Sequence, residues 1–383
     1  MVKRMKVALL SHRGGNIGHD FMAAGMEVVA REAFGADVEI AHYEQHRPFE
    51  VYSKGHPLRL VDRIPYGKLD SIKRMLNRPP ISRALWLSLG RLDARLAIAC
   101  GGPNIVDNAW KSVEMGSMFH HLPGAFHSQG VPVIDAAVGA CYPLERVPSS
   151  IDHPKNAAFY RRLFSYCAAS TVRDDVARRL WSGLGREVQL IPCAAIASGR
   201  TLEMVGSSPS KSARVVLINF QERGANEDWG QKVDVALWTN IIRELVQRMS
   251  RRHELAFICH NDKEASLSKA VAPSVPVYQP RDIAEYGRVI SNAKAALVSR
   301  VHAAIPLAGI GVPSITVGTD TRLGTVKLMG LEGIFVKEAS VEYLEDRLEH
   351  LMAIGSAEAE RLRDVREKTI FAYRDLILKI SGG

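Results

Sequence analysis

The sequence predicts an α/β protein with two doubly wound, Rossmann-like domains that face each other across a cleft. Three observations lead to this fold class. The 383 residues exceed one ordinary core and favour two domains. Short aliphatic runs alternate with amphipathic segments through both halves, as is typical of βαβ units. A Ser- and Gly-rich stretch of weak periodicity, residues 199–213, separates the halves and predicts a linker.

The first half is predicted to hold six strands and at least three helices, and we expect it to form a domain over residues 1–205. The strands are expected at 5–11, 36–43, 95–102, 131–139, 167–173 and 187–193. The helices are expected at 21–35, 156–166 and 174–185, the last of which ends at Gly183 or Gly185 as a C-cap.

The second half repeats the alternation, and we expect a domain over residues 206–355. Its strands are expected at 213–221, 253–260, 275–280, 294–299 and 312–318, and its helices at 232–249, 282–293, from His302 onward and around 325–331. The segment 356–383 is predicted to form one or two charged amphipathic helices that pack back on the first domain.

Composition narrows the class of protein. The net charge is +9, from 50 Lys+Arg against 41 Asp+Glu, which favours anionic partners. No basic motif with interleaved aromatic residues is present, so no nucleic acid partner is expected. No apolar run is long enough to span a bilayer, and the apolar stretch near the N-terminus is too short for a signal peptide. Five cysteines without a CxxC pair indicate free thiols in a cytoplasmic protein.

Ligands bind at the carboxyl ends of the strands in such sheets, so the residues there are the site candidates. Gly14, Gly15 and Gly18 follow the first strand and allow a tight turn before a helix N-terminus that favours anions; Asn16 or Asp20 capping that helix is the structural alternative. After the third strand, Gly101 and Gly102 allow close approach to a ligand. There Asp107 either reaches the cleft or caps a helix.

Charged residues end three further strands. Arg173 is either an anion clamp in the cleft or a partner of a nearby Asp. Arg300 ends a buried strand and His302 begins the next helix, with Pro306 expected near its first turn. A cation and an imidazole at a helix N-terminus suit anion binding and proton transfer; the positive helix end lowers the pKa of His302, and a bound dianion raises it again. Arg322 is expected to face the same cleft.

No metal site is expected from the sequence. His120, His121 and His127 lie close together along the chain, but their spacing fits no metal-binding face of a helix or strand. Cys259 and His260 are neighbours in a predicted strand and therefore point to opposite faces. No nucleophile elbow of the G-x-S-x-G type is present, so a serine hydrolase is not expected.

Four motifs, GGNIGHD (14–20), CGGPNIVDN (100–108), TVRDDVARRLWSGLG (171–185) and SRVHAAIPLAGIGVPSITVGTDTRLGTVKLMGL (299–331), resemble the polysaccharide pyruvyl transferase family. The resemblance implies a two-lobed fold like that of GT-B glycosyltransferases. It also implies transfer of the enolpyruvyl group of phosphoenolpyruvate to a saccharide as a ketal, with release of phosphate. The first domain would then lie on the acceptor side and the second on the phosphoenolpyruvate side. The cytoplasm, or the inner face of the membrane with a lipid-linked acceptor, is the expected location.

The resemblance matches Arg300 and His302 to the Arg and His of the family's phosphoenolpyruvate site, and Arg173 to its Arg in V-R-D. The roles that we assign on this basis are a hypothesis. Arg300 and Arg173 hold the donor with Arg322 as a third clamp, His302 transfers the proton, and Asn16, Gly18 and Asp107 complete substrate binding, with no cofactor or metal. Asp107 and Asp20 are candidate bases for the sugar hydroxyls. Three positions depart from the family pattern: His19 stands in place of Asp, Arg322 in place of Lys, and Cys193 in place of the usual Asp-Pro-Ala segment.

Two other classes of protein remain open at this stage. A nucleotide-sugar-dependent glycosyltransferase or epimerase of the same architecture would often carry a glutamate near the ribose, and Glu332 is the nearest candidate. A binding protein without activity would lack a proton donor in the cleft, whereas Arg300 and His302 are both present. The acceptor sugar and the oligomeric state are not predicted.

Overall fold

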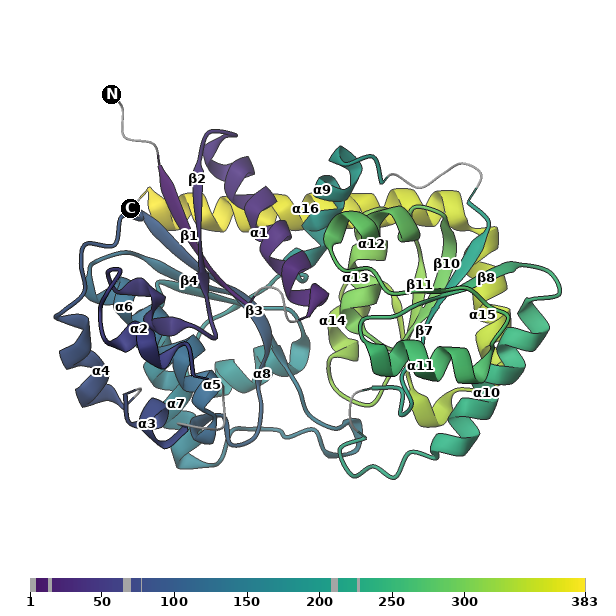
Figure 1. The fold of residues 1–383 in the computed structure, drawn as a ribbon, viewed down its shortest axis with the longest axis horizontal. Helices are drawn as coiled ribbons and strands as arrows, with labels where there is room; N and C mark the ends of the chain where they lie inside the picture. The colour runs from purple at the N-terminus through teal and green to yellow at the C-terminus, as the bar shows by residue number, and fades with distance from the viewer. Residues whose placement is uncertain are drawn as a thin grey trace.

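Two parallel sheets form the frame of a two-lobed molecule (Figure 1). The computed structural model describes residues 5–12, 16–64, 70–76, 78–207, 213–225 and 228–382. The first sheet has strand order β2-β1-β3-β4-β5-β6 and the second has order β12-β11-β10-β7-β8-β9. The predicted fold class, two doubly wound α/β units, is confirmed.

The strands of the first sheet are β1 (Lys6–Ser11), β2 (Glu39–Glu44), β3 (Leu96–Ile105), β4 (Val133–Ala140), β5 (Ala169–Val172) and β6 (Gln189–Leu190). Those of the second are β7 (Val215–Asn219), β8 (Glu254–Ile258), β9 (Val277–Tyr278), β10 (Ala293–Val298), β11 (Ser314–Gly318) and β12 (Glu332–Phe335). β3, β4 and β10 are almost continuously buried because helices cover both faces of each sheet.

The helices before the second sheet are α1 (Ile17–Phe34), α2 (Leu58–Val61), α3 (Asp70–Leu76), α4 (Pro79–Trp86), α5 (Val113–Gly116), α6 (Leu122–Ser128), α7 (Pro154–Tyr166), α8 (Asp175–Gly183) and α9 (Ser198–Met204). The later helices are α10 (Val235–Met249), α11 (Asp262–Val271), α12 (Ile283–Ile290), α13 (Val301–Gly309), α14 (Leu323–Lys327), α15 (Val341–Ala353) and α16 (Gly355–Ser381).

The predicted linker 199–213 is wrong in its first part. Residues 198–204 form α9, whose Leu202 is fully buried. The helix packs closely on α13: a Cβ added at Gly199 would lie 2.1 Å from the carbonyl oxygen of Gly309. Gly199, one of the glycines that suggested a linker, is therefore a small residue at a helix–helix contact. Residues 208–212 lie outside the described part of the chain, and the predicted domain boundary at 205–206 stays a prediction.

Two helices join the lobes. The single helix α16, yellow in Figure 1, runs along both of them. Its Leu362 packs in a cluster with second-lobe residues, while Ile370 and Tyr373 pack with first-sheet strands. The N-terminal part of α1 also reaches the second lobe, where Phe21 contacts the ring of Tyr286 at 5.1 Å between centroids. This packing fixes the start of α1 against the second lobe.

All five cysteines are buried and unpaired, as predicted. His120 and His121 are buried and each packs against aromatic rings, and burial lowers the pKa of each to about 3. Among the described residues, no helix combines the length and the apolar character that crossing a membrane requires.

Candidate active site

A cleft of about 690 Å³, counting space open to solvent, lies between the two lobes. The first lobe contributes Asn16, His19 and Arg173, and the second contributes Arg300, His302 and Arg322, together with other lining residues. Six of the side chains singled out from the sequence thus share one cavity at the carboxyl ends of the strands, where a doubly wound sheet binds its ligands.

His302 is the second residue of α13, which follows directly on β10. Burial is the main cause that lowers the pKa of His302 well below its usual value, and the Arg173 cation adds to it. The imidazole is therefore neutral at neutral pH. The prediction for Pro306 was wrong: the helix starts at Val301, so Pro306 lies in its interior. Proline lacks an N–H and leaves the carbonyl of His302 without its usual helical partner.

Arg173 follows β5 and is fully buried. Its Nη1 lies 3.3 Å from Nε2 of His302 and donates to Sγ of Cys193 at 3.2 Å. A guanidinium has no acceptor atom, so Nε2 of His302 accepts and the imidazole proton sits on Nδ1. Within the described part of the chain, Arg173 forms no ion pair, and its Nε has no hydrogen-bond partner.

Asp174, which follows Arg173 in the chain, is the N-cap of α8. Asp174 caps α8 by accepting from the backbone N–H of Ala177 at 2.7 Å, and it also accepts from Ala140 at 2.9 Å. Burial raises the pKa of Asp174 to about 6 in spite of these bonds. The alternative in which Arg173 pairs with a nearby Asp therefore does not hold in the described structure.

The other two arginines are paired with carboxylates that the sequence reasoning missed. Nε of Arg300 donates to Oε1 of Glu264 at 2.6 Å. Arg322 makes a forked contact with Asp320, with Nε–Oδ1 at 2.8 Å and Nη2–Oδ2 at 2.6 Å. A forked pair of this kind holds the guanidinium in one plane, which a lysine at 322 would not allow.

Glu264 is buried in the first turn of α11 and accepts several hydrogen bonds. It accepts from the amides of Asn219 and Gln221, each at 3.1 Å, and from the backbone N–H of His260 at 2.9 Å. Its own backbone N–H donates to the side chain of Asn261, the N-cap. The signal for this arrangement is the sequence Asn-Asp-Lys-Glu, an N-cap followed three residues later by Glu.

Asp320 is held at the contact between the lobes. Asp320 forms an antiparallel β-bridge with Pro143 of the first lobe. The hydroxyl oxygen of the next residue, Thr321, accepts from the backbone N–H of Tyr142, and the backbone N–H of Thr321 donates to the carbonyl oxygen of Tyr142. The Arg322 side chain is thereby positioned by a contact between segments about 180 residues apart in sequence.

The start of α1 forms the first-lobe wall. Asn16 is the N-cap and accepts from the N–H of Gly18 at 3.0 Å, which fits the capping alternative. Gly18 has no room for a side chain, because an added Cβ would lie 2.6 Å from Cβ of His302. Burial lowers the pKa of His19 to about 4. Asp20 borders an adjoining cavity together with Asn16, and Gly14 and Gly15 lie outside the described residues.

The prediction for Asp107 was wrong. β3 does not end at Gly102 but continues to Ile105, and Asp107 is exposed and absent from the lining of the cleft. Gly101 serves the sheet instead. An added Cβ at Gly101, whose φ is +48°, would lie 2.5 Å from the carbonyl oxygen of Ala136 on β4, so the close approach that it permits is to a neighbouring strand. An added Cβ at Gly102 would lie 2.6 Å from Oδ1 of Asn104 on the same strand.

Comparison with known proteins agrees with this architecture. A family model described as polysaccharide pyruvyl transferase matches residues 16–321, which is most of the chain. No curated protein sequence matches the chain. Among solved structures, the UDP-GlcNAc 2-epimerase of Neisseria meningitidis bound to UDP-GlcNAc is similar at a TM-score of 0.58 and 12% identity, over 98% of this chain and 100% of that one. The UDP-GlcNAc 2-epimerase of Methanocaldococcus jannaschii is similar at 0.50 and 10%, over 92% of each chain. At this identity the likeness concerns the fold, which is of GT-B type.

Proposed function

Because the chain belongs to the polysaccharide pyruvyl transferase family and is a transferase, we propose that it moves the enolpyruvyl group of phosphoenolpyruvate onto a saccharide as a pyruvate ketal. The observation that carries this proposal is the meeting of Arg173, Arg300 and His302 in one cleft at the start of α13. The acceptor is a saccharide, free or lipid-linked. A lipid-linked acceptor at the inner membrane face fits the positive net charge of +9.

The charges of the cleft suit a donor with both a phosphate and a carboxylate. Arg300 and Arg322 are each balanced by a carboxylate, whereas Arg173 has none at ion-pair distance in the described structure. Arg173 interacts electrostatically with Asp174 without forming an ion pair, so its guanidinium beside a helix N-terminus adds positive field for the donor. The paired arginines hold their guanidinium groups in a fixed plane, so they contribute directional hydrogen bonds rather than unscreened charge.

The reaction needs a proton at the methylene carbon of the donor. Protonation of that carbon leaves positive charge on the central carbon, where two acceptor hydroxyls form C–O bonds and the bond to the phosphate oxygen breaks. Of the two hydroxyl protons, one replaces the proton taken up by carbon and the other leaves with phosphate. A group with a pKa near the working pH is best suited to carry these protons.

His302 is the group that we assign to this task. It is neutral in the free enzyme, because burial and the neighbouring cations disfavour its charged form. A phosphate bound beside it raises its pKa, so donor binding is accompanied by proton uptake at the imidazole. The second proton would sit on Nε2, which accepts from Arg173 in the free enzyme, so this step requires Nη1 of Arg173 to turn from the ring to the bound donor. The protonated ring then serves as the acid for the donor carbon. Its position opposite Gly18 and beside Arg173 leaves little freedom to turn away.

The test is phosphate release from phosphoenolpyruvate in the presence of a panel of saccharide acceptors. His302→Gln is expected to lose at least two orders of magnitude in turnover, as for a general acid. The exposed His350→Gln on α15 is the control. Arg300→Lys is expected to weaken donor binding, with Arg248→Lys, an exposed arginine that also pairs with glutamates, as its control. Wild-type turnover in His302→Gln would refute the role assigned to the imidazole.

Glu332, the residue considered as a ribose-binding glutamate of a nucleotide-sugar enzyme, does not support that function. Oε2 of Glu332 accepts from Nε of Arg347 at 2.8 Å, and its other oxygen accepts from the hydroxyl of Tyr343. Glu332 does not line the cleft. A thermal-shift comparison of phosphoenolpyruvate with UDP-GlcNAc separates the two functions, and we expect only the former to stabilise the protein.

A further inference from the structure

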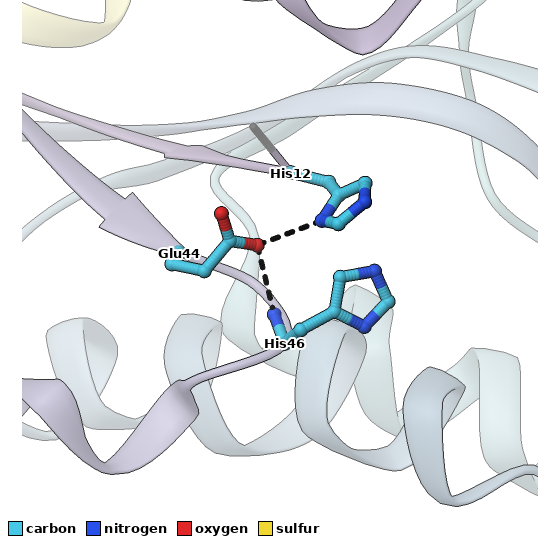
Figure 2. Close-up of side chains that lie close together, drawn as sticks. All are labelled: His12, Glu44 and His46. Carbon is cyan, nitrogen blue, oxygen red and sulfur yellow. Dashed lines mark hydrogen bonds and ion pairs between the residues drawn. The ribbon is translucent and has the colours of Figure 1, made fainter. Parts of the chain in front are cut away.

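A group of potential metal ligands lies at the carboxyl edge of the first sheet, outside the residues assigned to the donor. His12 directly follows β1, Glu44 is the last residue of β2, and His46 comes two residues later. The strands pair in register so that Ser11 lies opposite Glu44, which brings the three side chains together. Figure 2 shows the Glu44 carboxylate facing the two imidazole rings.

The distances are compatible with one ion. One ligand atom from each side chain can be chosen so that all three lie within 4.8 Å of one another. A tetrahedral ion with bonds of about 2.0–2.1 Å needs ligand atoms about 3.3 Å apart, so modest side-chain rotations close the site. The rings of His12 and His46 are already 3.8 Å apart between centroids, at 83° to each other.

The carboxylate is held in place for this role. Oε1 of Glu44 lies 2.9 Å from Nδ1 of His12 and accepts the backbone N–H of His46 at 3.1 Å. The side chains of His12 and Glu44 are each 20% exposed, so an ion here would be partly shielded and still reachable from solvent. A backbone donor that fixes one carboxylate oxygen orients the other, as the outer partners of metal ligands commonly do.

A second imidazole sets this group apart from two other His–Glu pairs of the chain. His42 with Glu27 and His253 with Glu349 have the same 2.9 Å contact. Each of these pairs has one imidazole per carboxylate, and neither belongs to a three-ligand group among the described residues. His46 is the residue that adds a third ligand to the pair of His12 and Glu44.

We propose that His12, Glu44 and His46 bind one divalent first-row transition ion, of which Zn²⁺ is the type. Two imidazoles and one carboxylate suit such ions, whereas Mg²⁺ and Ca²⁺ prefer oxygen ligands throughout. Three protein ligands leave at least one position open. The ring of His19 lies 4.8 Å from that of His12, and His19 lines the cleft, so the open position would lie near its first-lobe wall. This departs from the expectation of no metal drawn from the sequence.

Binding of the metal alone tests the proposal without any assay of transfer. The full-length chain, without a histidine tag, is stripped with a chelator and titrated with Co²⁺ as a spectroscopic probe and with Zn²⁺ in a calorimeter. We expect one equivalent of tight binding and visible Co²⁺ bands typical of four or five nitrogen and oxygen ligands. Thermal unfolding should shift upward with Zn²⁺, because the ion binds the folded chain.

The variants decide whether these residues are the ligands. His46→Ala and Glu44→Gln should each weaken Co²⁺ binding at least tenfold, while circular dichroism shows that the fold is kept. The matched control, His253→Ala, removes an imidazole from a similar pair in the second lobe and should bind like the wild type. Absence of saturable binding, wild-type Co²⁺ affinity in both variants, or thiolate charge-transfer bands from the cysteines would overturn the assignment.

Discussion

Replacement of Gly18 by alanine tests whether the start of α1 positions the imidazole of His302. The added Cβ would lie 2.6 Å from Cβ and 2.7 Å from Nδ1 of His302. Carbon atoms in contact are about 3.5–4.0 Å apart, so the ring must retreat by about 1 Å. The contact of His302 with Nη1 of Arg173, now 3.3 Å, would change by a similar amount and leave hydrogen-bonding range.

The expected loss is larger in function than in stability. A misplacement of about 1 Å at a reacting group is expected to lower turnover about 100-fold. Overpacking costs about 1–3 kcal/mol of folding free energy, and alanine in place of glycine in a helix recovers at most about 1 kcal/mol. The net loss of about 0–3 kcal/mol leaves a folded protein.

The assay compares phosphate release and urea unfolding for Gly18→Ala and for a control, Gly183→Ala. Gly183 ends α8, and an added Cβ there would meet no atom within 4 Å. The control should match the wild type in phosphate release and should gain at most about 1 kcal/mol in urea unfolding, since its added Cβ meets no neighbour. Unchanged turnover in Gly18→Ala would show that the close contact between α1 and His302 does not position the catalytic group.

Three further predictions concern buried charges. Burial raises the pKa of Asp135 to about 8, against 3.8 for the same group in the unfolded chain. Between these two pH values the folded state keeps a proton that the unfolded state has lost. The free energy of unfolding should therefore fall as the pH rises from about 4 to about 8. Asp135→Asn should remove this pH dependence, and its free energy of unfolding in urea at pH 7 should exceed that of the wild type by at most about 4 kcal/mol. A pH dependence like that of the wild type would contradict the prediction. Arg173→Met removes the cation beside His302 and should raise the pKa of that imidazole in an NMR titration. The variant should also bind phosphoenolpyruvate at least tenfold more weakly. An unchanged pKa of His302 would count against the contact. Glu264→Gln leaves Arg300 without its carboxylate and should lower the free energy of unfolding by about 3 kcal/mol. Inorganic phosphate should restore part of this loss. If phosphate stabilised the variant and the wild type equally, the loss would not come from the unpaired Arg300.

The sequence was sufficient where a residue's position follows from its own element. Arg300 and His302 could be placed because an aliphatic strand ends just before them and a helix starts there. Arg173 could be placed in the same way from β5. Local patterns of this kind depend only on the period of the side chains and on the parallel order of the strands.

What the sequence could not supply are the partners of these cations. Glu264 is 36 residues from Arg300, and the contact depends on the strand order β10-β7-β8, which brings the start of α11 near the end of β10. The bridge between Pro143 and Asp320 depends on the docking of the two lobes. Asp107 failed for a different reason, since a glycine pair that usually marks a turn instead lies inside a strand.

The metal ligands were missed for a related reason. His12, Glu44 and His46 belong to two strands separated by α1, and no spacing along the chain reveals them. The register between β1 and β2, which pairs Ser11 with Glu44, brings them together. Pairing of this kind is a property of the sheet and not of either strand alone.

Calorimetric titration of the wild-type chain with phosphoenolpyruvate, in two buffers that differ in ionisation enthalpy, tests the central claim most directly. We predict saturable binding at one site and an apparent enthalpy that differs between the buffers in the sense of proton uptake, because the bound phosphate raises the pKa of His302. The same titration with UDP-GlcNAc should give no binding. Saturable binding of UDP-GlcNAc together with no binding of phosphoenolpyruvate would contradict the account.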